Sequence, residues 1–189
     1  SGGYTISTAQ KHGGNASFYN PGNQGFVTTA SDSRLAFGTG DYSLSGWFYF
    51  TKWDSNNGWA MLFDSRSTAS GSGGIYSGVN SSQIGVGTTW LGNHGMSLNT
   101  WNFIEFRRIN GTLTAYVNNV AIGSSPDATN YTSGTMTFGA CSYSPLGVCQ
   151  FSGYFDDIAI ASGMAQYANS YTQDALTPNA VNSYTYDAA

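Results

Sequence analysis

Apolar side chains along this chain alternate with Ser, Thr and Gly over short runs, which is the two-residue period of a β-strand with two different faces. The clearest run is YSLSGWFYF at 42–50, in which Leu44 and Phe48 share one face and Trp47 takes the other. We find no long segment with the apolar spacing of an amphipathic helix. The pattern therefore predicts many short strands, at residues 16–18, 25–28, 42–50, 59–63, 74–78, 83–87, 101–108, 112–117, 120–123, 135–138 and 154–160.

The segment 101–123 predicts a three-stranded meander with two tight turns. Asn110-Gly111 separates the first two strands, and both residue types tolerate the positive φ angles of a type I′ turn. Asn118-Asn119 separates the second and third strands. Together with the many glycines between runs, this pattern favours an all-β, two-sheet antiparallel sandwich with little or no helix.

Length and composition narrow the class of protein. The 189 residues suit one domain, and only 8% are charged, against about 25% in ordinary soluble domains. The six Lys and Arg residues are scattered, so no basic stripe for nucleic acid exists. No apolar run approaches the roughly 18 residues of a membrane span, and the first residues do not resemble a signal peptide.

Cys141 and Cys149 lie eight residues apart and allow two interpretations. They are either two separate thiols or a local disulfide that closes a loop, which requires Cα atoms within roughly 7 Å of each other. No second Cys or His pair lies nearby, so zinc is not expected.

Several motifs resemble the laminin-G-like, concanavalin A-like jelly-roll domains. They are NASF at 15–18, FGTGDYSL at 37–44 with GWFY at 46–49, WNFI at 101–104, LTAYVNNV at 113–120 and GYFDDI at 153–158. The order of these motifs over residues 13–172 is similar to the version of the domain found in tailed-bacteriophage structural proteins. Two positions depart from the family pattern, Ala159 in place of a common Arg and Asn119 in place of a turn glycine, and they weaken the transfer of a binding site.

The resemblance implies a domain layout. We expect an N-terminal arm at 1–12, a jelly-roll sandwich at 13–167, and an extended C-terminal segment at 168–189 that packs on the domain or on a partner.

Catalysis is not expected, because the residues for it are missing. Glycoside hydrolysis needs two carboxyl groups across one bond, and Glu105 is the only glutamate in the chain. Asp156 and Asp157 are neighbours in a predicted strand, so they point to opposite faces. A serine or cysteine nucleophile needs a base, usually His, and we interpret His12 as part of the N-terminal arm and His94 as a surface histidine in the glycine-rich loop 90–95.

These residues do not require a cofactor. Ca²⁺ is nevertheless a candidate bound ion, because sandwiches of this type often bind it at a rim. The candidate ligands are Asp41, Asp156, Asp157 and the loop DSNN at 54–57. The alternative for Asp156 is a structural acceptor for loop N–H groups.

Carbohydrate binding needs exposed rings beside amide and carboxylate groups. The candidates are Trp53 with Asp54, Asn56 and Asn57, Trp90 with Asn93, and Tyr143. Trp47, Trp59 and Trp101 are expected in the core.

Two functions follow: a non-enzymatic virion protein of the capsid-decoration or tail-fibre type, which binds other virion proteins or itself, and a lectin-like module that binds glycans. The first places the chain on a virion surface, and the second is compatible with an extracellular location.

Overall fold

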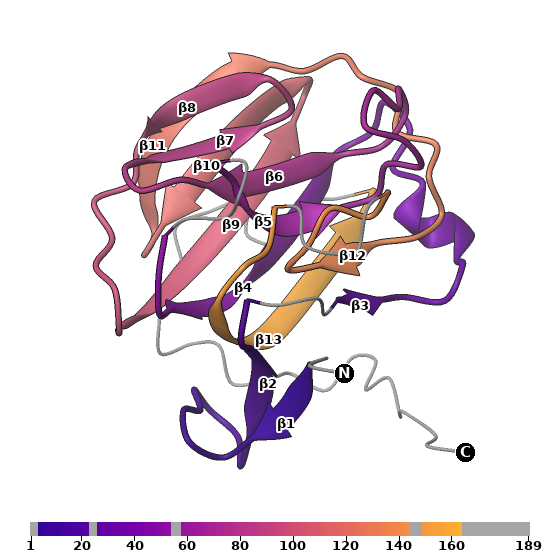
Figure 1. Ribbon diagram of the computed structural model, residues 1–189. Helices are drawn as coiled ribbons and strands as arrows, with labels where there is room; N and C mark the ends of the chain where they lie inside the picture. Colours follow the sequence, from indigo (N-terminus) through magenta and orange to yellow (C-terminus); the bar gives the residue numbers. More distant parts are fainter. Residues whose placement is uncertain (1–3, 23–25, 54–57, 144–148, 164–189) are drawn as a thin grey trace.

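The computed structural model describes residues 4–22, 26–53, 58–143 and 149–163, and it confirms the predicted all-β sandwich of two antiparallel sheets (Figure 1). Apart from a single 3-10 turn at Ser33–Leu35, these residues contain no helix. No helix among them is therefore long and apolar enough to span a membrane.

Sheet A has seven strands, and sheet B, which lies in front of it in Figure 1, has six. Sheet A runs in the order β1 (Thr5–Ser7), β2 (Ser17–Asn20), β13 (Gly153–Ser162), β4 (Tyr42–Phe50), β9 (Trp101–Ile109), β10 (Thr112–Val117) and β11 (Val120–Pro126). Sheet B runs in the order β3 (Val27–Thr28), β12 (Thr137–Phe138), β5 (Ala60–Asp64), β6 (Tyr76–Val79), β7 (Gln83–Val86) and β8 (Thr89–Asn93).

The predicted meander is present as β9, β10 and β11. Asn110 and Gly111 have φ angles of 48° and 71°, and Asn118 and Asn119 have φ angles of 48° and 68°. Both pairs of turn residues therefore adopt the left-handed backbone that a primed turn requires. The asparagines suit these positions because their short polar side chains tolerate this conformation better than most residues do.

Two segments that the sequence does not predict as strands form strands in the structure. Thr5–Ser7, within the predicted N-terminal arm 1–12, forms edge strand β1 and pairs with β2. Thr89–Asn93, which the glycine-rich sequence suggests as a loop, forms edge strand β8 and pairs with β7. The predicted C-terminal segment 168–189 lies outside the described residues.

The core lies between the sheets and is lined by alternate residues of each strand. In β4 the inward residues Leu44, Phe48 and Phe50 are fully buried in it. The alternate residues Ser43, Ser45, Trp47 and Tyr49 therefore point to the outer face of sheet A. In sheet B, Leu62, Val79 and Ile84 point inward. Several outward-facing aromatic residues, among them Tyr49, Trp59 and Trp101, are only half-buried and are left available for a ligand.

Candidate functional site

The outer face of sheet B carries two glycines that directly oppose each other. Gly78 of β6 pairs with Gly85 of β7, and Gly85 pairs with Trp90 of β8. A Cβ at Gly78 would lie 3.1 Å from Trp59 Cε3, and one at Gly85 would lie 3.1 Å from Trp59 Cη2 and 3.0 Å from Trp90 Cε3. Two tryptophan rings therefore lie close to bare backbone at a place where ordinary side chains would push them away.

The rings on this face form a continuous row. Trp59 stacks on Trp90 with centroids 4.0 Å apart and planes 17° apart, and it meets Tyr76 edge-to-face at 6.2 Å. All three side chains are half-buried, so each still presents aromatic surface to solvent. Beneath them Met61 packs with the Cys141–Cys149 pair in a small apolar cluster separate from the main core.

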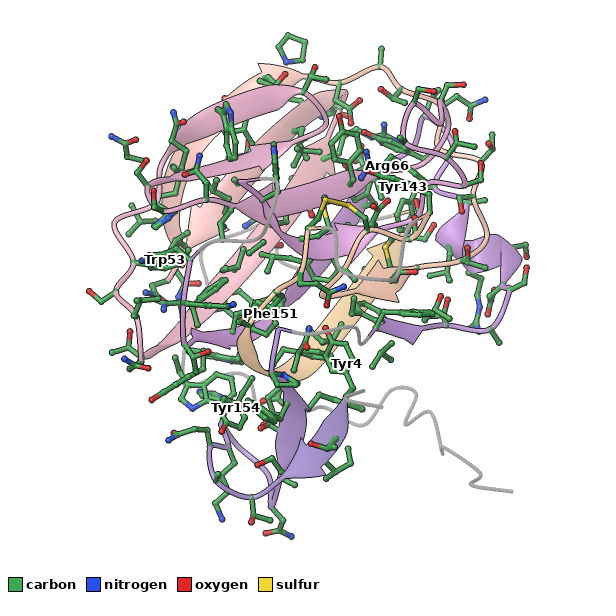
Figure 2. The ribbon with its side chains drawn as sticks, in the orientation of Figure 1. Tyr4, Trp53, Arg66, Tyr143, Phe151 and Tyr154 are labelled. Carbon is green, nitrogen blue, oxygen red and sulfur yellow. A yellow bond between two sulfur atoms is a disulfide. The ribbon has the colours of Figure 1, made fainter. Side chains whose placement is uncertain are left out.

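Arg66 continues the row toward Tyr143, beside which it lies in Figure 2. Its guanidinium carbon lies 3.6 Å from the Tyr76 ring centroid and 4.8 Å from that of Tyr143. The Arg66 side chain is buried and pairs with Asp64 through two hydrogen bonds, Nε to Oδ1 at 3.0 Å and Nη2 to Oδ2 at 2.7 Å. The charge of Arg66 is therefore neutralised by Asp64, and its guanidinium packs against both tyrosine rings.

The structure joins Cys141 to Cys149 in a disulfide, with Cα atoms 5.6 Å apart. Of the two interpretations of these cysteines, the local disulfide is the one present. Arg66 Nη2 lies 3.6 Å from Cys141 Sγ, and Asp64 Oδ2 accepts a hydrogen bond from the backbone N–H of Ser142. The disulfide and the ion pair together position Tyr143 at one end of the row.

We call Trp59, Tyr76, Trp90 and Tyr143 the sheet B patch. At its Trp90 end, Gln83 and Asn93 face each other across β7 and β8, and the side chain of Asn93 is exposed. The patch therefore combines ring surface, which packs against apolar C–H groups, with amides that donate and accept hydrogen bonds. Arg66, which lies beside the patch, is paired with Asp64, so its charge is neutralised.

The structure brings together three of the predicted binding residues, Trp90, Asn93 and Tyr143, on sheet B. Trp53 is elsewhere: it packs against the main core, with Phe50 and His94 at centroid distances of 4.9 Å. Asp54, Asn56 and Asn57 lie outside the described residues.

The expectation that Trp59 and Trp101 belong to the core is wrong. Trp59 belongs to the sheet B patch, and Trp101 is half-buried and absent from the core cluster. Trp47 is only 4% exposed, but it lies on the outer face of sheet A, where His12 stacks on it at 3.7 Å. The alternation of Trp59 with inward Ala60 and Leu62 was a signal for its position, since residues flanking an inward residue point outward.

The predicted calcium ligands Asp41, Asp156 and Asp157 do not form one site, and the candidate loop 54–57 lies outside the described residues. Asp41 Oδ1 accepts the Asn110 N–H at 2.8 Å, next to the start of β4, whereas Asp156 pairs with Trp47 farther along that strand. Asp156 accepts the N–H groups of His12 and Asp157, at 3.1 and 3.0 Å. No group of three His, Cys, Asp or Glu side chains within the described ranges is placed to hold a metal ion. The contacts of Asp156 are those of a structural acceptor.

Comparison with known proteins gives the family of the fold. Residues 21–165 match a family model described as the concanavalin A-like lectin/glucanases superfamily. No curated protein matches the chain.

Solved structures with this fold differ strongly from the chain in sequence. Domain 4 of AbnA, an extracellular arabinanase of family GH43 from Geobacillus stearothermophilus in complex with arabinotriose, has a TM-score of 0.61 and 17% identity, over 84% of this chain and 76% of that one. The cellulose-induced protein Cip1 has a TM-score of 0.58 and 17% identity, over 86% of each chain. The CBM40 of the Ruminococcus gnavus IT-sialidase bound to α2,3-sialyllactose has a TM-score of 0.52 and 9% identity, over 66% and 77%.

Proposed function

Because the chain belongs to the concanavalin A-like lectin/glucanase superfamily, we propose that it is a lectin-like domain that binds neutral carbohydrate through the sheet B patch and does not catalyse a reaction. The observation that carries the proposal is the row of half-buried rings outside the core, ending at the exposed amide of Asn93. Two of the similar structures contain a bound oligosaccharide, neutral arabinotriose in one and acidic sialyllactose in the other, which supports carbohydrate as the class of ligand.

The charge of the patch favours a neutral glycan over an acidic one. A carboxylate or sulfate on a sugar needs a cation with free N–H groups. Arg66 directs its guanidinium to Asp64, to the carbonyl of Ala69 and to Cys141, so four of its five N–H groups have acceptors inside the protein. Hydroxyl groups of a neutral sugar can bond instead to amides such as that of Asn93.

The environment of Glu105 supports a role without catalysis. Its carboxylate accepts hydrogen bonds from Arg107 Nε at 3.1 Å and Arg107 Nη2 at 2.9 Å, and both side chains are buried on sheet A. Burial raises the pKa of Glu105, while Arg107 opposes that rise. No second carboxylate contacts it in the described part of the chain, and two are needed for glycoside hydrolysis.

The proposal is tested by replacing Trp90. Trp90→Ala removes half of the Trp59–Trp90 stack, and we expect it to weaken binding to neutral oligosaccharides on a glycan array by at least about tenfold, since burying one ring contributes roughly 1–3 kcal/mol. The matched control is Phe26→Ala, which truncates a ring that is 42% exposed away from the patch. Each protein is assayed with Ca²⁺ and with a chelator, which tests the calcium prediction in the same experiment.

The array has two outcomes that contradict this proposal. One is a folded Trp90→Ala variant that binds every glycan as the parent does. The other is a parent protein that binds no glycan in either buffer.

A virion role is a second proposal, and the exposed apolar pair on β1 and β2 favours it. Ile6 is 66% exposed, and it faces Phe18 across these edge strands. Such a pair on an open sheet edge suits contact with another chain. The virion surface is then the location of the protein. A chain that sediments strictly as a monomer and is missing from purified particles would contradict this role.

A further inference from the structure

We propose that the outer face of sheet A carries a second carbohydrate site, formed by Tyr19, Tyr154, Tyr49 and Trp101, that binds an extended neutral glycan chain. It shares the ligand class of the proposed function but none of its residues. We call these four residues the sheet A row.

The sheet A row is a set of directly paired residues on four adjacent strands. Tyr19 of β2 pairs with Tyr154 of β13, Tyr154 pairs with Tyr49 of β4, and Tyr49 pairs with Trp101 of β9. The successive ring centroids are 4.6, 5.7 and 5.6 Å apart. Because neighbouring strands are about 4.8 Å apart, the row crosses the sheet over about 15 Å. That length suits a short linear oligosaccharide better than a single sugar ring.

The ring planes leave aromatic surface for a ligand. Tyr19 and Tyr154 are stacked, with planes 30° apart. Tyr49 meets Tyr154 at 85° and Trp101 at 64°, so it is stacked face to face with neither. All four side chains are half-buried, on the side of the sheet that does not contribute to the core.

The polar tips of the row favour a hydroxyl-rich ligand over an apolar protein surface. The hydroxyls of Tyr19, Tyr49 and Tyr154 and the indole N–H of Trp101 make no hydrogen bond with another described residue. An apolar partner would cover these groups without pairing them, which costs free energy. A sugar offers hydroxyls to the tips and C–H groups to the rings.

The charges beside the row favour a neutral chain. The ring of His12 lies 5.8 Å from that of Trp101, and its Nδ1 lies 3.3 Å from Asp157 Oδ2. The row itself contains no ionisable group that is charged at neutral pH.

The two sites lie in separate parts of the molecule. In Figure 2, Tyr154 lies at the lower left, near β2, whereas Arg66 and Tyr143 lie at the upper right. The rows also belong to different sheets, so one ligand chain on each would lie on opposite faces of the sandwich. A domain with two such sites can bridge two glycan chains.

The test uses the full chain in affinity electrophoresis through gels that contain hydroxyethylcellulose or linear arabinan, and calorimetry with cellohexaose and cellobiose. Tyr49→Ala and Tyr154→Ala are expected to weaken binding to the polymers and to the hexasaccharide at least tenfold. They are expected to change binding to the disaccharide less. Tyr49→Phe keeps the ring and removes the hydroxyl. The affinity that this variant loses therefore measures the contribution of the Tyr49 hydroxyl alone.

The matched control is Tyr116→Ala, which removes a tyrosine ring from β10, outside the row, where it contacts Arg107. Circular dichroism and thermal unfolding confirm that each variant folds. The proposal is overturned if folded Tyr49→Ala and Tyr154→Ala bind all probes as the parent does, or if the parent binds none of them.

Trp90→Ala separates this proposal from that of the sheet B patch. If both sites bind, Trp90→Ala weakens binding to the long chains but leaves the part of it that depends on Tyr49, and the combination Trp90→Ala with Tyr49→Ala loses that part too. If Trp90→Ala alone removes all binding, the second site is overturned and the sheet B patch stands. If only the tyrosine variants lose binding, the sheet B patch is overturned and the second site stands.

Discussion

Arg108 is fully buried, and its guanidinium is held by backbone carbonyl groups. It donates hydrogen bonds to Gly38, Gly40 and Thr129, at distances of 2.6–2.8 Å, and its Nη1 lies 3.3 Å from Asp127 Oδ2. The side chain thus ties the loops before β4 and after β11 to the middle of sheet A. A buried charge is tolerated here because nearly all of its donors have acceptors.

Replacing Arg108 therefore leaves several acceptors unpaired. We expect Arg108→Met to lower the free energy of unfolding by about 3–5 kcal/mol, which is the usual effect of breaking a buried ion pair. Urea unfolding measures it. The comparison variant is Arg34→Ala in the solvent-exposed pair with Asp32, which is expected to lower the free energy of unfolding far less. Equal effects of the two variants would contradict this account of Arg108.

His94 makes the stability of the fold depend on pH. Its Nε2 donates to the carbonyl of Asn80 at 3.1 Å, and its Nδ1 accepts the Met96 N–H at 3.0 Å, so the neutral ring satisfies both contacts. Burial lowers the pKa of His94 below its ordinary value of about 6.5. Protonation of Nδ1 would place its N–H against the backbone N–H of Met96, so the hydrogen bond between them would be lost.

The sign of the pH effect follows from this lowered pKa. Above pH 6.5 the ring is neutral in both the folded and unfolded chains. As the pH falls below 6.5, the unfolded chain binds the proton first, so we expect stability to fall by up to about 1.4 kcal/mol per pH unit until the folded pKa is reached. Thermal unfolding from pH 8 to pH 4.5 measures it. If His94→Gln, which does not titrate, loses stability over this range as the parent does, another group is responsible.

At the scale of elements, β5 and the disulfide work as one unit. β5 ends at Asp64, which pairs with Arg66 and accepts the N–H of Ser142 beside Cys141. The bulge between Met61 and Phe63 changes the alternation within β5, so that Leu62 and Phe63 both reach the main core. The small cluster of Met61 and the two cysteines therefore supports the sheet B patch from below.

Removing the disulfide should consequently affect both stability and binding. For the loop it closes, the chain-entropy model predicts that the double variant Cys141→Ala, Cys149→Ala loses about 2.5 kcal/mol of stability. Because Tyr143 adjoins Cys141 through Ser142, we also expect weaker binding at the sheet B patch. Denaturant unfolding and the glycan array measure the two effects. A variant with unchanged binding would show that Tyr143 does not depend on the disulfide.

At the scale of the whole molecule, the N-terminal residues complete sheet A. β1 lies at its edge beside β2, and the two strands project below the sandwich in Figure 1. Between them, His12 returns to sheet A, stacks on Trp47 and contacts Asp156 and Asp157. Residues 4–12 are therefore part of the packed domain, and His12 covers one tryptophan.

Deletion of residues 1–12 tests this role. We expect it to remove the β1 pairing and the His12–Trp47 stack, with a loss of about 2 kcal/mol, or roughly 4–8 °C in Tm. Acrylamide should then quench tryptophan fluorescence more strongly, because Trp47 loses its cover. His12→Ala is the partial control and should show only a fraction of both changes. A deletion variant with the parental Tm and quenching would mean that residues 1–12 do not stabilise the domain.

The sequence by itself determined the fold class, the strands of the meander and their turns. Those features depend on local physics: a two-residue period selects β-strands, and Asn and Gly accept the backbone that tight turns require. It also identified Trp90, Asn93 and Tyr143 as binding candidates. Only the tertiary structure decided which tryptophans are available. Trp53 is predicted as an exposed binding residue, yet it packs against the core, whereas Trp59 is predicted in the core and faces outward. The sheet A row depends on the register of four strands that are far apart in the sequence, and such register is set by packing between the sheets.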